Sequence, residues 1–214
     1  MRRLIKAGTM LAAVTLAGAL AACSAGAGSG AGGSGGASAA KSATLTISNE
    51  NGALWTCDFS PFNGSDTLLS VGLVYETLDY VNPLQDGKVT PMLASAYSWG
   101  AGDKSLTFTI RSGVKFSNGT PLTANDVAYT FNLIKKYPAL DLPGVWSVLS
   151  SVTATGDQVT MDFSAAAVPW FYYIADQVPI VSEAIWSKVA NPVAYPDKDP
   201  VGTGPYMVDR KSVV

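Results

Sequence analysis

Alternating apolar and polar residues predict several strands along this chain. Residues 43–49 alternate apolar side chains with threonine and serine, the period of two that is typical of a half-buried strand. Residues 105–110 alternate in the same way, and two further apolar positions, Val114 and Phe116, suggest that this second strand continues. Residues 151–164 alternate on both sides of a Gly-Asp pair, which predicts a β-hairpin.

Apolar residues spaced three and four positions apart predict helices. The first is expected over residues 66–78, with Ser65 or Asp66 as its cap. The best-defined helix follows Thr123, which stands three residues before Asp126 in a variant of the capping box. Two lysines and then a proline mark the end of this helix. Lysines are favourable there because the carboxyl end of the helix dipole attracts cations, and the proline stops the helix.

The last third of the chain combines short helices with turns. Short helices are predicted to begin near Pro169 and, after the end of a strand, at a cap formed by Ser182. Several prolines and glycines then turn the chain before an apparent strand from Tyr206. Strands and helices therefore occur without regular alternation, which predicts a mixed fold, either α+β or α/β with irregular insertions.

The first 22 residues have the pattern of an export signal. Arg2, Arg3 and Lys6 form a cationic start, and residues 7–22 carry no charge. This uncharged segment is shorter than the roughly 20 apolar residues that a spanning helix needs. Its end, Leu-Ala-Ala followed by Cys23, resembles a bacterial lipobox, in which the cysteine is lipidated. The alternative is an ordinary secretory signal that happens to precede a cysteine.

A linker of small residues follows this cysteine. Residues 24–43 consist of Gly, Ala and Ser with one lysine, and such a segment is expected to be a flexible coil with a reach of about 25 Å. The sequence therefore divides into a lipoprotein signal peptide at 1–22, a lipid-anchored linker at 23–43 and a folded region at 44–214. In this interpretation Cys23 is the attachment atom, and the linker holds the folded region away from a membrane.

Composition excludes several classes of function. Without the three cations of the signal, the chain has 11 Lys and Arg against 16 Asp and Glu, a net charge of −5, which argues against nucleic-acid binding. The chain has no histidine, so Ser-His-Asp and Cys-His hydrolase centres and His-rich metal sites are excluded within it. If Cys23 carries lipid, Cys57 has no disulfide partner in the chain, and a buried apolar role is favoured for it.

Five segments carry a more specific pattern. They are LVYETLDY (73–80), VTPMLASAYSW (89–99), LTFTIRSGVKFSNGTPLTANDVAYTF (106–131), VPIVSEAIW (178–186) and PVGTGPY (200–206). In the central one a strand ends at Arg111, and a Gly-Val-Lys-Phe step, an Asn-Gly-Thr-Pro turn and a Thr-Ala-Asn-Asp-Val helix start follow. With these motifs in this order, the chain from about Thr44 onward resembles family 5 of the bacterial extracellular solute-binding proteins, the peptide-binding group that serves ABC importers.

The resemblance implies a two-lobed fold, of which this chain is expected to contain only a part. Family members resemble a periplasmic-binding-protein-like clamshell of type II, whose two lobes enclose the ligand. Residues 44–214 match only its N-terminal portion, the first part of lobe one with its inserted subdomain. The resemblance also implies passive binding without catalytic residues, metal or cofactor, and we expect that this chain is not an enzyme.

Candidate ligand-binding residues lie in a loop after the first predicted strand. The resemblance places the end of that strand at the cleft, with Asn49, Asn51 and Trp55 close behind. The indole of Trp55 offers a stacking surface to a sugar ring or a peptide side chain, or it packs against the helix predicted from residue 66. The asparagines offer hydrogen bonds to a ligand amide or hydroxyl, or they only form the turn.

A second candidate loop contains Thr203 and Gly204. The resemblance places this segment where the chain returns to lobe one, near the cleft. Its glycines allow close backbone approach, including approach to a ligand. A phosphate cradle is not expected here, because the Gly-Thr-Gly motif is short and Pro205 removes an amide donor.

The resemblance implies a function and several partners. We expect a monomeric substrate-binding lipoprotein on the extracytoplasmic face of the cell membrane, which captures oligopeptides and delivers them to the permease of an ABC importer. The rival within the family is an oligosaccharide binder, favoured by Trp55 and the aromatic residues near it. A more distant alternative is a surface interaction lipoprotein without a small-molecule ligand.

Overall fold

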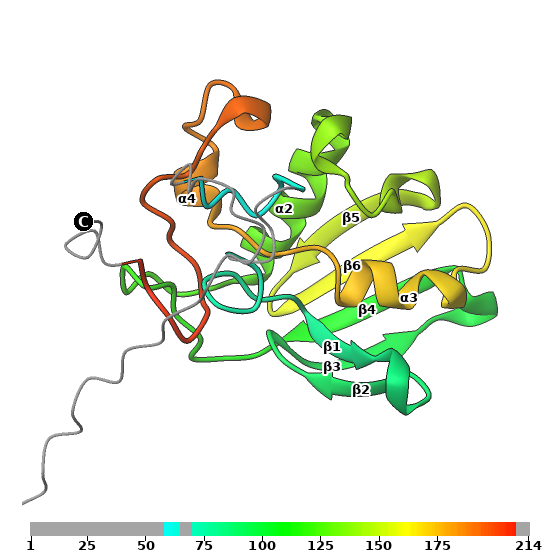
Figure 1. Cartoon of the computed structure of the whole chain (residues 1–214). Helices are drawn as coiled ribbons and strands as arrows, with labels where there is room; N and C mark the ends of the chain where they lie inside the picture. The colour runs from blue at the N-terminus through cyan, green and yellow to red at the C-terminus, as the bar shows by residue number, and fades with distance from the viewer. Residues whose placement is uncertain (1–57, 65–69, 209–214) are drawn as a thin grey trace, which may run out of the picture. The chain divides into compact units, whose positions relative to one another are not determined.

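The computed structural model describes residues 58–64 and 70–208, which all belong to one unit of the chain, Glu50–Val214. Its main element is a four-stranded antiparallel sheet in the order β3-β4-β6-β5 (Figure 1). These strands are β3 (Ala94–Trp99), β4 (Ser105–Ile110), β5 (Leu149–Thr155) and β6 (Gln158–Phe163). A two-stranded hairpin precedes them, formed by β1 (Asp79–Asn82) and β2 (Lys88–Pro91).

The four-stranded sheet has one apolar and one polar face because its strands alternate. In β4 the side chains of Leu106, Phe108 and Ile110 are buried, as the sequence pattern predicts. On the opposite face, Thr107 and Thr160 join hydroxyl groups across β4 and β6 at 3.2 Å. The predicted hairpin around the Gly-Asp turn is confirmed as β5 and β6.

Helices cover the apolar face of this sheet (Figure 1). The α-helices are α2 (Ala124–Lys136), α3 (Phe171–Ala175) and α4 (Glu183–Trp186). Single-turn 3₁₀ helices are η1 (Pro83–Gln85), η2 (Ala101–Asp103), η3 (Pro138–Leu140), η4 (Val145–Ser147), η5 (Val168–Trp170) and η6 (Pro192–Ala194). Helix α2 packs on β5 and β6. The ring centroid of Phe171 in α3 lies 4.4 Å from the ring centroid of Tyr97 and 6.2 Å from that of Phe108. The prediction of mixed α and β elements is confirmed.

Asp126 stabilises the start of two helices. Its Oδ2 atom accepts hydrogen bonds from the backbone N–H of Thr123 at 2.9 Å and from the Thr123 hydroxyl at 2.7 Å, which confirms the predicted capping box. Its Oδ1 atom accepts a hydrogen bond from the backbone N–H of Glu183 at 3.0 Å. Ser182 stands at the predicted N-cap of α4 but makes no side-chain cap, so the carboxylate of Asp126 performs that role. It thereby ties α4 to α2.

The helix predicted over residues 66–78 is wrong over residues 71–78, whereas Ser70 is helical. Between residues 71 and 78 the chain makes turns, and Gly72 has a φ of +82°, which ends a helix. The backbone carbonyl of Val74 accepts a hydrogen bond from the N–H of Gly204 at 2.8 Å. A contact with a segment about 130 residues away therefore overrides the local helical spacing over residues 71–78.

Two strand predictions are also corrected. Strand β4 ends at Ile110 and does not continue to Val114 and Phe116, because Gly113 turns the chain with a φ of +79°. No strand is assigned over residues 206–208, although the N–H of Tyr206 donates to the carbonyl of Leu73 at 3.0 Å. The strand predicted at 43–49 lies outside the described residues.

Candidate functional site

The loop with Gly202, Thr203 and Gly204 is held between two other segments. The carbonyl of Gly202 accepts a hydrogen bond from the N–H of Ser117 at 2.8 Å, and the N–H of Gly204 donates to Val74. Both glycines lie so close to this backbone that a side chain does not fit: a Cβ atom on Gly204 would lie 2.8 Å from the carbonyl carbon of Val74. The close approach predicted for these glycines is therefore made to the chain's own backbone.

Thr203 differs from its neighbours because its side chain has an unused hydrogen-bonding group. Its Oγ1 atom is buried and has no hydrogen-bond partner among the described residues. A buried hydroxyl without a partner costs about 1–3 kcal/mol, which makes Thr203 a candidate contact for a polar ligand group. Ligand binding by Thr203 and Gly204 stays a prediction. Asn49, Asn51, Trp55 and the lipidation residue Cys23 lie outside the described residues.

A buried tyrosine and aspartate join the segment around Val74 to the chain just before this loop. Tyr75 is fully buried, and its hydroxyl donates a hydrogen bond to Oδ2 of Asp197, which is 1% exposed. Burial raises the pKa of Asp197 to about 6, and the negative charges of Asp58 and Asp199 act in the same direction. Burial, together with the charge of Asp197, also raises the pKa of the Tyr75 phenol.

The raised pKa of Asp197 predicts that stability falls as the pH rises through about 6. The folded chain binds this proton more tightly than the unfolded chain, where the pKa is 3.8, so the stabilisation is complete below that value and is lost above the folded pKa. Urea unfolding at successive pH values measures the slope. Asp197→Asn keeps an oxygen for Tyr75 and is expected to flatten the slope between pH 4 and 7. Equal slopes in the two proteins would contradict this assignment.

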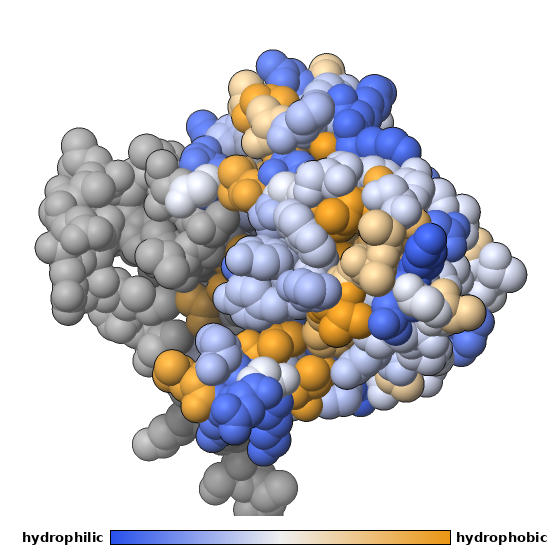
Figure 2. Space-filling model, turned by 90° about the vertical axis from the view of Figure 1, so that its right-hand side faces the viewer, coloured by the Kyte–Doolittle hydropathy of each residue, from blue (hydrophilic) through white to orange (hydrophobic). Residues whose placement is uncertain are grey.

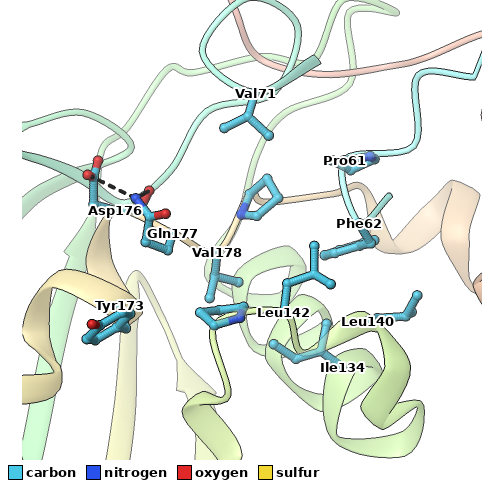
Figure 3. Close-up of a pocket in the computed structure, with 12 residues that line it drawn as sticks. Pro61, Phe62, Val71, Ile134, Leu140, Leu142, Tyr173, Asp176, Gln177 and Val178 are labelled. Atoms are coloured by element: carbon cyan, nitrogen blue, oxygen red, sulfur yellow. Dashed lines mark hydrogen bonds between the residues drawn. The ribbon is translucent and has the colours of Figure 1, made fainter. Parts of the chain in front are cut away.

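An apolar cavity of about 470 Å³ lies between Val71, α2 and the end of α3, within the size range of small-molecule sites. Figure 3 shows Val71, Pro61 and Phe62 along one part of it, with Ile134 and Leu142 opposite. The remaining lining residues are Leu140, Pro143, Tyr173, Asp176, Gln177, Val178 and Pro179. The wall is thus apolar or aromatic except at one end.

The polar end of this cavity is formed by Asp176 and Gln177, which directly follow α3. The Gln177 side-chain amide donates to Oδ2 of Asp176 at 3.3 Å (Figure 3). Burial raises the pKa of the Asp176 carboxyl, opposed by a hydrogen bond from the backbone of Val81. The arrangement can hold a small apolar group by burial and orient it through a few polar atoms. Its described lining residues include no nucleophile paired with a base.

Sequence patterns did not point to Asp79, Asp176 or Asp197. Asp79 is 1% exposed at the start of β1, and its Oδ2 atom has no hydrogen-bond partner among the described residues. Burial raises its pKa to about 6, and the charge of Asp176 acts in the same direction. The sequence signal for Asp79 was its position between the apolar residues Leu78 and Val81, which are both buried. A charged residue is unusual in such a position.

The surface around the cavity is partly apolar. Leu142 and Tyr173, which line it, are 54% and 44% exposed, and Figure 2 shows apolar patches lying between hydrophilic ones on one face of the molecule. Within residues 58–64 and 70–208, His, Cys, Asp and Glu form no group that could hold a metal ion. No helix in the same part of the chain is long and apolar enough to cross a membrane.

Comparison with known proteins decides the family. Residues 88–213 match the family described as bacterial extracellular solute-binding proteins, family 5, middle region. The chain belongs to this family. Four of the five segments that carried the resemblance, at 89–99, 106–131, 178–186 and 200–206, lie within this match, and the segment at 73–80 lies outside it. The mixed fold agrees with solved structures of solute-binding proteins.

Three similar proteins illustrate the family. The nickel-binding periplasmic protein of Escherichia coli is 27% identical over 167 residues, which are 74% of this chain and 31% of that protein. A periplasmic oligopeptide-binding protein of an oligopeptide ABC transporter from Thermotoga maritima is 32% identical with a TM-score of 0.67, and it has also been solved with mannohexaose bound. A dipeptide-binding protein from a Pseudoalteromonas species, in complex with Met-Leu, is 27% identical with a TM-score of 0.58.

The match covers only part of each relative. This chain aligns over 74% of its own residues with the Thermotoga protein but over 30% of that protein's chain, and over 70% with the Pseudoalteromonas protein but over 34% of its chain. The chain of this family 5 solute-binding protein therefore spans about a third of the length of its relatives.

Proposed function

We propose that this chain is part of the substrate-binding lipoprotein of an ABC importer and that its solute is an oligopeptide. The observation that carries the proposal is the family match over residues 88–213, together with relatives whose names describe oligopeptide and dipeptide binding. The cavity beside α3 supports it, since a concave apolar wall with a few polar groups suits reversible capture of a small ligand.

Capture would be passive in this proposal. The ligand would be enclosed between this part of the protein and a second lobe. Ligand binding would shift the equilibrium from the open to the closed conformation, and the closed conformation would dock on the permease. Asn49, Asn51 and Trp55 would contact the ligand from the first loop, and Thr203 and Gly204 from the second. The unpaired hydroxyl of Thr203 offers a hydrogen bond for a peptide amide.

The proposed location is the extracytoplasmic face of the cell membrane. Cys23 would carry the lipid after removal of residues 1–22, and the linker at 23–43 would hold a monomeric binding domain near the permease. Cys23→Ser is therefore expected to move the protein from the membrane fraction to the soluble exported fraction, because stable anchoring needs the acyl chains. Fractionation with mass spectrometry of the N-terminal peptide checks this. A lipid-free Cys23 on a membrane-bound wild-type protein would contradict it.

An oligosaccharide is the second candidate solute. It is favoured by the mannohexaose bound to the Thermotoga protein and by Trp55, whose indole could stack on a sugar ring. A surface interaction lipoprotein without a small-molecule ligand is the more distant alternative.

Calorimetric titration of the full-length gene product separates these candidates. Mixed tri- to pentapeptides are expected to bind and to raise the unfolding temperature, since a ligand at 100 times its Kd stabilises a protein by about 2.7 kcal/mol. Cello- and manno-oligosaccharides serve as the comparison. Binding of sugars alone would replace the peptide proposal by the oligosaccharide proposal. If neither class binds, the surface interaction lipoprotein is the remaining candidate.

A further inference from the structure

Two neighbouring cavities meet at the end of α3. The first is the apolar cavity described above, and the second has a volume of about 490 Å³. Both are lined by Val71, Asp176 and Gln177. The second is completed by Gly72, Glu76, Thr77, Tyr80, Thr90 and Met92. We call the two together the α3 groove.

The charges that line the α3 groove are all negative. Asp176 belongs to both cavities and Glu76 to the second, whereas no lysine or arginine among the described residues lines either cavity. A third carboxylate, Asp79, lies close enough to Asp176 for the charge of Asp176 to raise its pKa. Asp79 is buried, and its Oδ2 atom has no hydrogen-bond partner among the described residues.

Arg111 is the cation whose charge acts on Asp79. The Arg111 guanidinium donates to the backbone carbonyl of Met92 at 2.7 Å and to that of Pro91 at 3.3 Å. It lowers the pKa of Asp79 less than burial raises it. Asp176 and Glu76 thus line the groove with the buried Asp79 close to Asp176, and a positive ligand group would offset the repulsion between these carboxylates.

We propose that the α3 groove binds the side chain of a lysine or arginine residue of a peptide, with the cationic group at Asp176 and Glu76. The aliphatic part of such a side chain is apolar and matches the wall formed by Val71, Leu142 and Val178. A neutral sugar offers no charge to these acids, and an acidic side chain would be repelled by them. This assignment rests on the proposed peptide function and names the ligand's chemical class.

The test compares peptides that differ only in the charge of one side chain. Tripeptides with a central lysine, norleucine or glutamate are titrated into the full-length gene product by calorimetry. Norleucine keeps the aliphatic chain of lysine without its ammonium group. The lysine peptide is expected to bind about ten-fold more tightly than the norleucine peptide, the factor that corresponds to about 1.4 kcal/mol, and the glutamate peptide more weakly than both.

Two variants assign this preference to the groove. Asp176→Asn and Glu76→Gln should each reduce the ratio of the affinity for the lysine peptide to the affinity for the norleucine peptide. Asp157→Asn, an exposed residue in the β5–β6 turn, removes one negative charge elsewhere and should leave the preference intact. Circular dichroism verifies that each variant is folded.

Each result supports or overturns the assignment. Equal affinity of the wild-type protein for the lysine and norleucine peptides overturns the groove's charge selectivity but leaves the peptide function standing. A lysine preference that persists in both groove variants places the cation elsewhere and also overturns it. Failure of all three peptides to bind overturns the peptide function and this assignment together.

Discussion

Gly202→Ala is expected to destabilise this protein by about 3 kcal/mol, near the upper end of the usual cost of overpacking a core. Gly202 is buried, and a Cβ atom at this position would lie 2.6 Å from the carbonyl carbon of Val74 and 3.2 Å from the Tyr75 ring. Backbone atoms cannot rotate away as a flexible side chain can. Gly202 is also fixed on its other side, where its carbonyl accepts a hydrogen bond from Ser117, so the loop can relieve the clash only by giving up hydrogen bonds.

Urea unfolding measures this loss, with Gly64→Ala as the matched control. A Cβ atom added to Gly64 would have no neighbouring atom within 4 Å in the part of the chain that the structure describes, and Gly64 does not have the positive φ that strains a side chain. Its replacement should therefore change the free energy of unfolding by less than about 1 kcal/mol. Similar unfolding curves for Gly202→Ala and the wild type would mean that the loop does not pack on residues 73–75 as described.

Local sequence signals sufficed where an element is stabilised by its own neighbours. Helix α2 has its capping residues, its apolar spacing and its terminal lysines within one continuous segment, and it forms where predicted. The β5–β6 hairpin likewise needs only alternation and a glycine turn. Residues 71–78 show the limit, because several of their backbone partners lie far along the chain, among them Ile180, Gly204 and Tyr206. No window around the predicted helix contains this information.

The candidate site was predictable only in part for the same reason. Sequence patterns singled out Thr203 and Gly204, and the structure explains the glycine by contact with the chain's own backbone. The cavity combines residues from around position 61, from α2, from the loop after η3 and from the end of α3. Its acidic end depends on burial of Asp79 and Asp176, which is a property of the folded chain and of no local motif.

Trp186→Ala is expected to cost about 3–5 kcal/mol, the usual range for removing a large buried aromatic side chain. The indole is 1% exposed and makes edge-to-face contacts with Phe62 and Tyr195, each at 5.2 Å between ring centroids. Since Phe62 also lines the apolar cavity, the variant should weaken ligand binding as well as folding. Urea unfolding and peptide titration measure the two effects.

Trp186→Phe tests whether the losses of stability and affinity in Trp186→Ala come from the missing aromatic ring. A phenyl ring keeps the edge-to-face partners of Phe62 and Tyr195 and fills most of the space, so it should recover most of both stability and affinity. Leu84→Ala is the control for apolar truncation, because Leu84 is 94% exposed and surface substitutions change stability by about 0.5 kcal/mol or less. If Trp186→Ala unfolds at the same urea concentration as Leu84→Ala, the packing of Trp186 against Phe62 contributes little to stability. Residues other than Trp186 would then keep Phe62 in the cavity wall that the proposed ligand contacts.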